Sequence, residues 1–190
     1  MDSIALVAFL GNHGKKYEKN RHNVAWLCAD SLPFLQNTSW QKKFRGQCTG
    51  FSVNDYTGYA LKPETFMNAS GESIAQCAAF YKIPPQQILV VHDELELPAG
   101  TLSLKWAGGL GGHNGLRSTK ECLGTADFWR LRLGIGRPNH DNISSWVLSD
   151  FTADESILMS QVFSVTEKLF DCIFTNDIHK LLPQWKKVVI

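Results

Sequence analysis

Apolar runs of strand length alternate with segments of helical periodicity along most of the chain, and this pattern restricts the fold more than any other sequence feature. Strands are expected at IALVAFL (4–10), KFRGQCTGFSV (43–53), GYALKP (58–63), ILVVHDE (88–94), TLSLKW (101–106) and WRLRLGIG (129–136). Helices are expected at 24–32, 70–83 and 114–124. The alternation predicts an α/β fold in which a central mixed, mostly parallel twisted sheet is flanked by helices.

The length of the chain favours one such unit. With 190 residues, of which 44% are hydrophobic, the chain can bury a continuous core and is short for two domains. Residues from about 144 to 174 are amphipathic and predict a helical C-terminal segment. We therefore expect residues 1–190 to form a single domain.

Cysteine usage and the N-terminal sequence bear on the compartment. The five cysteines are widely spaced without a C-x-x-C motif, so we expect reduced and mostly buried thiols rather than disulfides or a zinc cluster. The first apolar run is short and follows an acidic residue, which suits a strand better than a signal peptide. No apolar stretch reaches the length of a membrane span. These features predict a cytoplasmic protein without a membrane partner.

The net charge of +1 is distributed unevenly. Residues 1–140 hold 15 Lys and Arg against 11 Asp and Glu, whereas residues 141–190 hold 4 against 7. This balance disfavours a protein that binds nucleic acid over its whole surface. Composition does not distinguish a local basic face in the first part from ordinary solvated charges.

Polar side chains gather where the expected strands end, and ligands of α/β sheets bind at the carboxyl ends of strands. One candidate constellation comprises Asn12, His22-Asn23, Phe66-Met67-Asn68, His92-Asp93-Glu94 and His113-Asn114. It holds histidines, an acid and asparagines, and the chain has no G-x-S-x-G motif for a covalent nucleophile. For a hydrolase, water activated by a base is then the simplest nucleophile.

The segment GGLGGHNGLRS (108–118) contains five glycines around His113-Asn114. It does not match the dinucleotide-binding fingerprint, because Asn114 stands where the third glycine is required. Glycine permits tight turns and positive φ, so we expect this loop to form a cleft wall beside the histidine. A phosphate cradle is the alternative.

A metal centre is a second way to activate water, and His22, His92, His113 and Asp93 are possible ligands. No H-E-x-x-H or H-x-H spacing supports such a centre, so we expect neither a metal nor a cofactor. A metal-dependent hydrolase would instead bring three or more of these residues within ligand reach. A catalytically silent RNA-binding module would have the basic face without a His22–Asp93 cluster.

Four segments, in the same order and at similar separations, resemble the bacterial-type peptidyl-tRNA hydrolase family. They are FLGNHGKKYEKNRHNVAW (9–26), LKPETFMNASG (61–71), ILVVHDELELPAGTLSLKWAGGLGGHNGLRS (88–118) and FWRLRLGIGRP (128–138). The resemblance spans about residues 4–150. It implies a monomeric α/β enzyme that hydrolyses the ester between a peptide and tRNA, and so releases tRNA stalled in translation.

The resemblance also implies roles for individual residues. His22 matches the catalytic base, and Asp93 matches the carboxylate that orients it. The residues that match or flank substrate-binding positions are Asn12, Tyr17, Phe66, Met67, Asn68, His113 and Asn114. Lys105 and Arg132 match a basic pair associated with the 5′ phosphate of tRNA. From the residues alone, Asn68 and Asn114 are also candidates for helix N-caps, a role that does not exclude substrate binding.

Three residues depart from the family pattern. His13 stands where proline is usual, so Asn12 is expected to be less rigidly pre-organised. Ser103 replaces a second basic residue, and Ala107 replaces the first of three usual glycines. The last two departures are expected to alter tRNA affinity.

Overall fold

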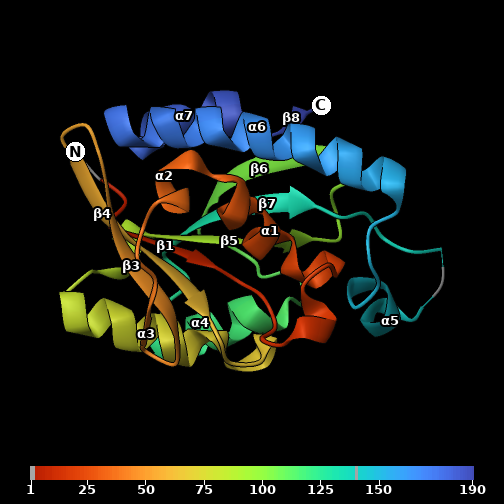
Figure 1. The fold of residues 1–190 in the computed structure, drawn as a ribbon, viewed down its shortest axis with the longest axis horizontal. Coiled ribbons are helices and arrows are strands. Elements are labelled where there is room, and N and C mark those ends of the chain that lie inside the picture. The colour runs from red at the N-terminus through yellow and green to blue at the C-terminus, as the bar shows by residue number, and fades with distance from the viewer. Residues whose placement is uncertain (1–2, 140) are drawn as a thin grey trace.

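Eight strands of the computed structural model, which describes residues 3–139 and 141–190, form one sheet in the order β2-β3-β4-β1-β5-β7-β6-β8 (Figure 1). Their bounds are β1 Leu6–Phe9, β2 Gln41–Lys43, β3 Gly46–Val53, β4 Tyr56–Pro63, β5 Ile88–Glu94, β6 Thr101–Trp106, β7 Trp129–Gly134 and β8 Val188–Val189. Strands β4, β1, β5 and β7 are parallel neighbours. The pairs at both edges are antiparallel.

The expected mixed α/β sheet is confirmed, but its parallel part is confined to the four central strands. Of the seven strand pairs among the described residues, three are parallel and four are antiparallel. Loop length explains the edges. Only Asn54 and Asp55 separate β3 from β4, and residues 95–100, which connect β5 with β6, are too few for the crossover that would make these two strands parallel.

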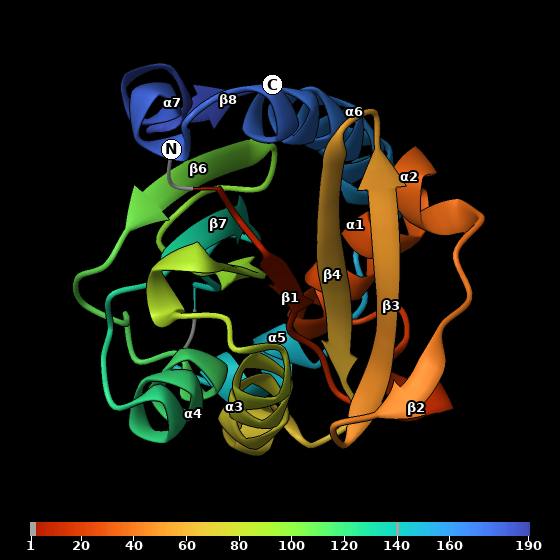
Figure 2. The same cartoon turned by 90° about the vertical axis from the view of Figure 1, so that its left-hand side faces the viewer.

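Helices cover both faces of the sheet (Figure 2). Helices α1 (Val24–Ser31), α2 (Pro33–Gln36) and α6 (Ala153–Thr175) lie on one face, and α3 (Ser70–Tyr81) and α4 (Asn114–Leu123) lie on the other. Helix α5 (Ile143–Val147) precedes α6, and α7 (Ile178–Trp185) follows it. Four short 3₁₀ turns lie at Lys15–Tyr17 (η1), Arg21–Asn23 (η2), Met67–Ala69 (η3) and Pro85–Gln87 (η4).

The alternation of side chains along β1 divides the core into two layers. Val7 and Phe9 pack toward α1 and α6, whereas Leu6 and Ala8 pack toward α3 and α4. Helices α3 and α4 approach closely at Gly71, where a Cβ would lie 2.1 Å from the Ser118 carbonyl oxygen. This contact fixes the N-terminus of α4 beside η3.

The C-terminal segment is helical as expected, although it divides into three helices and ends in β8, a strand too short for its pattern to be recognised. Helix α6 begins with a capping box in which Thr152 and Glu155 each bond the other's backbone N–H. Cys28, Cys48 and Cys77 are buried, in line with the expected thiols. Among the described residues, no helix combines the length and apolarity needed to cross a membrane.

Candidate functional site

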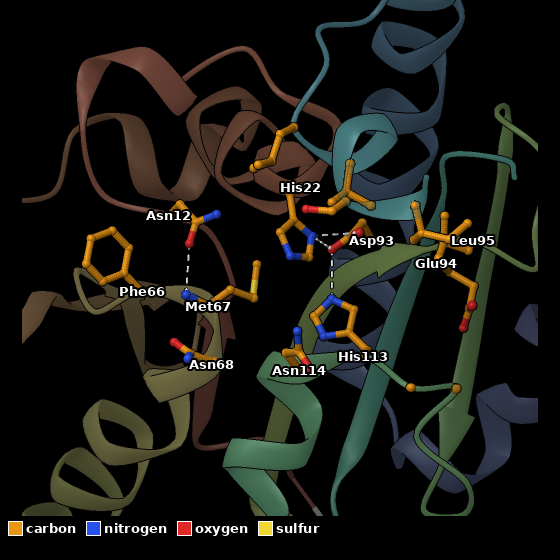
Figure 3. A pocket seen from close by; sticks show the side chains of 16 residues that line it. Asn12, His22, Phe66, Met67, Asn68, Asp93, Glu94, Leu95, His113 and Asn114 are labelled. Carbon is orange, nitrogen blue, oxygen red and sulfur yellow. Dashed lines mark hydrogen bonds and ion pairs between the residues drawn. The ribbon is translucent and has the colours of Figure 1, made fainter. Parts of the chain in front are cut away.

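A pocket of about 540 Å³ lies at the carboxyl ends of the parallel strands (Figure 3). Strands β1, β4, β5 and β7 all end at this edge, and the segments that follow them supply the walls. The lining residues are Asn12, His22, Phe66, Met67, Asn68, Asp93, Glu94, Leu95, Gly111, Gly112, His113, Asn114, Ile143, Ser144, Val147 and Leu148. Most of the constellation expected from the sequence therefore lines one pocket.

Asp93 lies at the centre of the polar floor, between two histidines. The His22 Nδ1 atom is 2.9 Å from both carboxylate oxygens, and the His113 Nε2 atom is 2.8 Å from Oδ1. His113 Nδ1 accepts the backbone N–H groups of Gly115 and Leu116 at 3.1 and 3.3 Å. The His113 proton is therefore on Nε2, where it is donated to Asp93.

The contact with Asp93 also orients His22. Nδ1–H donates to the carboxylate, so the lone pair of Nε2 is available, and Figure 3 shows this nitrogen turned away from Asp93 into the pocket. Burial alone would lower the pKa of His22, but the charge and hydrogen bond of Asp93 outweigh it and raise the pKa above its ordinary value. This geometry suits a proton acceptor.

The carboxylate of Asp93 remains ionised although it is buried. Burial would raise the pKa of Asp93, yet the charges and hydrogen bonds of His22 and His113 hold it far below its ordinary value. His92 has a different environment, because it is buried, does not line the pocket, and donates from Nδ1 to the Asp93 backbone oxygen at 2.7 Å. Burial and His113 lower the pKa of His92 well below its usual range. A neutral, structural His92 follows.

Asn12 is rigidly held although His13 replaces the usual proline. Its backbone N–H donates to Asn23 Oδ1 at 2.8 Å, and its backbone oxygen accepts from Asn23 Nδ2 at 2.9 Å. Its side-chain Oδ1 accepts the Met67 N–H at 2.8 Å. The expectation of looser pre-organisation is therefore not met, because Asn23 and Met67 fix the loop. The amide nitrogen of Asn12 is left to face the pocket as a donor.

Asn68 and Asn114 are exposed at the pocket rim and do not cap helices. The N-cap of α4 is His113, whose ring accepts the first N–H groups, and α3 has Ala69 at its N-cap. Across residues 3–139 and 141–190, no side-chain hydrogen bond engages the amide of Asn68 or Asn114. The capping alternative is therefore wrong for both, and their donors and acceptors are available to a ligand. Phe66 beside them is 65% exposed, whereas Met67 is buried.

The glycine loop forms part of the pocket wall, as expected. Gly111 and Gly112 line the pocket with φ of 61° and 75°, a region that other residues rarely adopt. Buried Arg130 holds the start of the loop by donating to the backbone oxygens of Gly109, at 2.8 Å, and Ala107. No sequence pattern indicated that Arg130 would hold this loop.

Ala107 adopts a φ of 47°, so its departure from glycine costs conformational energy. We expect Ala107→Gly to raise the free energy of unfolding by about 0.5–1 kcal/mol, because relief of the left-handed strain exceeds the entropy that glycine adds to the unfolded chain. Urea denaturation measures this change. The matched control Ala126→Gly, at a residue without positive φ, should lower it by about 0.5–1 kcal/mol. Equal destabilisation by both substitutions would contradict the strain at Ala107.

Lys105 and Arg132 lie beyond the pocket, on one face of strands β6 and β7. Ser103 pairs with Arg132 and Lys105 with Arg130 in the antiparallel register. Arg132 donates to Ser103 Oγ at 2.7 Å, and its Nη1 lies 3.6 Å from Glu94, a pocket residue. Ser103 therefore orients Arg132 instead of adding a charge. Burial and the charges of Arg130 and Arg132 lower the pKa of Lys105, as expected where cations are held together.

Tyr17, in η1, was expected to contact the substrate, but like Lys105 and Arg132 it does not line the pocket. Two pocket features escaped sequence reasoning. Glu94, although recognised in the HDE motif, had no assigned role and connects the pocket with Arg132. The apolar wall of α5, formed by Ile143, Val147 and Leu148, lies outside the motifs altogether.

The metal alternative meets its geometric requirement of three candidate ligands within reach of one another. Ligand atoms of His22, Asp93 and His113 all lie within 4.8 Å of one another. The separations from Asp93 are those of hydrogen bonds, and a metal ion would have to displace the protons that both histidines share with the carboxylate. The same three residues therefore fit a base-and-carboxylate site without rearrangement.

Comparison with known proteins identifies the family. The family model for peptidyl-tRNA hydrolase matches residues 6–189. Peptidyl-tRNA hydrolase of Treponema pallidum (strain Nichols) is 46% identical over 192 residues, with 97% of this chain and 95% of the relative covered. That of Lactobacillus gasseri is 43% identical over 184 residues, with 96% and 100% covered.

A comparison with solved structures points to the same family. The crystal structure of peptidyl-tRNA hydrolase from Acinetobacter baumannii matches with a TM-score of 0.91 and 31% identity, and covers 98% of this chain and 96% of its own. The resemblance carried by the four sequence segments is confirmed. The chain belongs to the peptidyl-tRNA hydrolase family.

Proposed function

We propose that this protein hydrolyses the ester that joins a peptide, or an N-blocked amino acid, to tRNA, and so frees tRNA from stalled or dropped-off peptidyl-tRNA. The observation that carries the proposal is the His22–Asp93 pair, which lies in a pocket that the side chains of three asparagines also line. Family membership supports the same substrate.

In this mechanism His22 Nε2 takes a proton from water as the water oxygen attacks the ester carbonyl carbon. Asp93 holds the ring through Nδ1 and stabilises the imidazolium that forms. The bond between that carbon and the ribose oxygen then breaks, and His22 gives its proton to this oxygen, which becomes the ribose hydroxyl. The products are a peptide with a free carboxyl group and tRNA. His113 acts through Asp93, because it donates to the same carboxylate.

The three asparagines suit the peptide side of the substrate. Asn12 offers its amide nitrogen as a fixed donor, because Met67 N–H already occupies its oxygen. Asn68 and Asn114 supply both donors and acceptors for a peptide group without adding charge. We assign contacts with the acyl chain to Phe66 and Met67, and we keep Tyr17 as a substrate contact outside the pocket.

Lys105 and Arg132 are proposed to bind the 5′ phosphate of tRNA. These two side chains and Arg130 form a cluster of three positive charges, next to the carboxylate of Glu94. A bound phosphate would reduce the repulsion between the three charges. We further propose that the protein acts as a monomer in the cytoplasm. The family resemblance supports the monomer, and the five free thiols support a reducing compartment.

Hydrolysis of N-acetylated aminoacyl-tRNA, with and without 1,10-phenanthroline, tests this function. This chelator binds transition metals and leaves Mg²⁺ with the RNA. Release of free tRNA that the chelator does not change supports the base mechanism. The second candidate, a metal-dependent hydrolase at His22, Asp93 and His113, requires loss of activity with the chelator and recovery with added metal.

Substitution of Lys105 and Arg132 should distinguish tRNA binding from catalysis. We expect the double variant Lys105→Gln, Arg132→Gln to have a higher KM for full-length N-acetylated aminoacyl-tRNA. The slope of log KM against log salt concentration should fall by at most about one unit for each lost phosphate contact. Turnover at His22 should persist, because neither side chain lines the pocket. The measurement is kcat and KM at two salt concentrations.

A minimal substrate, with the same ester on a short nucleotide fragment, provides the comparison for this pair. It does not reach Lys105 and Arg132, so the double variant should process it like the unaltered protein. Lys168→Gln, which removes an exposed charge from α6 on the other face of the sheet, controls for net charge. Equal losses on both substrates would mean that the pair supports the fold or the catalytic centre.

A further inference from the structure

Arg21 precedes His22 in η2, but its side chain extends away from the pocket toward the chain between α5 and α6. It is buried, with 3% exposure, which is unusual for an arginine. Its backbone N–H donates to the Ser149 oxygen at 3.0 Å, and neighbouring Asn20 forms a bridge with Asp150. The loop that carries His22 is therefore attached to residues more than a hundred positions away.

The guanidinium contacts residues 146–155, which run from α5 through this connection into the first turn of α6. Nη1 donates to Ser149 Oγ at 2.7 Å and to the Asp150 backbone oxygen, and Nη2 donates to Glu155 Oε2 at 2.5 Å. The guanidinium carbon lies 3.8 Å from the Trp146 ring centroid, so the two planar groups are in contact. A planar fork with several fixed donors matches these partners, whereas a lysine ammonium would not.

The segment that Arg21 holds also forms the apolar wall of the pocket. Ile143, Val147 and Leu148 of this region line the pocket together with His22, and Figure 3 shows the α5 ribbon beside His22. Trp146, between them in sequence, faces Arg21 and donates its Nε1–H to the Gly136 oxygen at 2.8 Å. One side of α5 therefore contacts the arginine while the other borders the pocket.

We propose that Arg21 is a positioning residue that fixes the α5 wall relative to His22, so that the wall binds the acyl part of the substrate next to the base. The inference rests on the proposed hydrolysis of peptidyl-tRNA. Arg21 does not contact Asp93 or the pocket, so it acts on substrate binding through α5. Its loss should raise KM, leave kcat little changed and leave the pH dependence set by His22 unaltered.

The kinetic test uses the full-length protein and the minimal N-acetylated ester. Arg21→Lys keeps the charge and Arg21→Ala removes it; we expect KM to rise about tenfold in the alanine variant and less in the lysine variant, with kcat within about threefold. Glu155→Gln should act in the same direction more weakly, because glutamine at this position preserves the capping box. If Arg21→Ala does not fold, Glu155→Gln tests the same contact in its place. Arg137→Ala, which removes an exposed pair with Glu96, is the matched control.

A spectroscopic readout tests the wall independently of catalysis. Fluorine NMR of protein labelled with 5-fluorotryptophan reports all six tryptophans, and Trp146→Phe assigns the Trp146 signal. In Arg21→Lys this signal should shift while the signal of Trp185, in α7, remains. An unchanged KM together with an unchanged Trp146 signal, or an equal KM effect in Arg137→Ala, would overturn the proposal. Absence of hydrolysis by the unaltered protein would reject the function, whereas the Trp146 signal would still test the contact.

Discussion

Alanine in place of His22 is expected to lower kcat for N-acetylated aminoacyl-tRNA by at least about 10²-fold, the typical minimum contribution of a general base. The reason is geometric: Nε2 is the nitrogen that faces the pocket, and Asp93 already occupies Nδ1. Binding of deacylated tRNA should change little, because the substitution does not alter the basic pair. Single-turnover hydrolysis and tRNA binding, measured on the same preparations, check the two parts.

His13→Ala is the matched control, because His13 lies in the same loop with its side chain 58% exposed and 3.6 Å from Glu64. Asn12 should keep its place in this variant through Asn23 and Met67. Activity of His13→Ala close to that of the unaltered protein would assign the loss to His22 alone. Near-normal turnover in His22→Ala would instead reject the histidine as the base.

The pH dependence gives a second measure of the same mechanism. A base must be neutral, so kcat/KM should rise with pH through the pKa of His22, and Asp93 raises this pKa. The acid limb should therefore lie above the ordinary value of about 6.5 for histidine. In Asp93→Asn the negative charge is gone, so the limb should move to lower pH while the plateau falls less than in His22→Ala.

The sequence predicted the components of the site better than their contacts. Asn12 follows β1 and Asp93 lies at the carboxyl end of β5, so the rule for strand ends brings them to one edge of the sheet. His22 and Asp93 are 71 positions apart, and only the family resemblance suggested that they touch. The double use of His113, which caps α4 and donates to Asp93, depends on one ring having two nitrogens in two environments. No spacing in the sequence encodes that.

Two features could not be predicted because they depend on contacts between separate parts of the chain: the way Asn12 is held without a neighbouring proline, and the α5 wall of the pocket. A proline fixes a loop through its own ring, so its effect can be read from a single position. Asn23 instead fixes Asn12 through two hydrogen bonds between its side-chain amide and the Asn12 backbone, 11 positions away. The α5 wall becomes part of the pocket because Arg21 and Trp146 pack together across the fold. Such arginines look like ordinary surface charges in sequence, since burial and partners are tertiary properties.

The asparagines should make the protein discriminate strongly between a blocked and a free amino group. We expect N-acetylated aminoacyl-tRNA to be cleaved at least about 10²-fold faster than the free aminoacyl-tRNA, because a free amine lacks the amide that these side chains would bind and brings a charge that must be desolvated. The ratio of kcat/KM for the two substrates measures this. Asn68→Ala and Asn114→Ala should reduce the ratio by slowing the blocked substrate, whereas the control Asn37→Ala, at an exposed position after α2, should keep it. Comparable rates on the two substrates in the unaltered protein would remove the asparagines from this role.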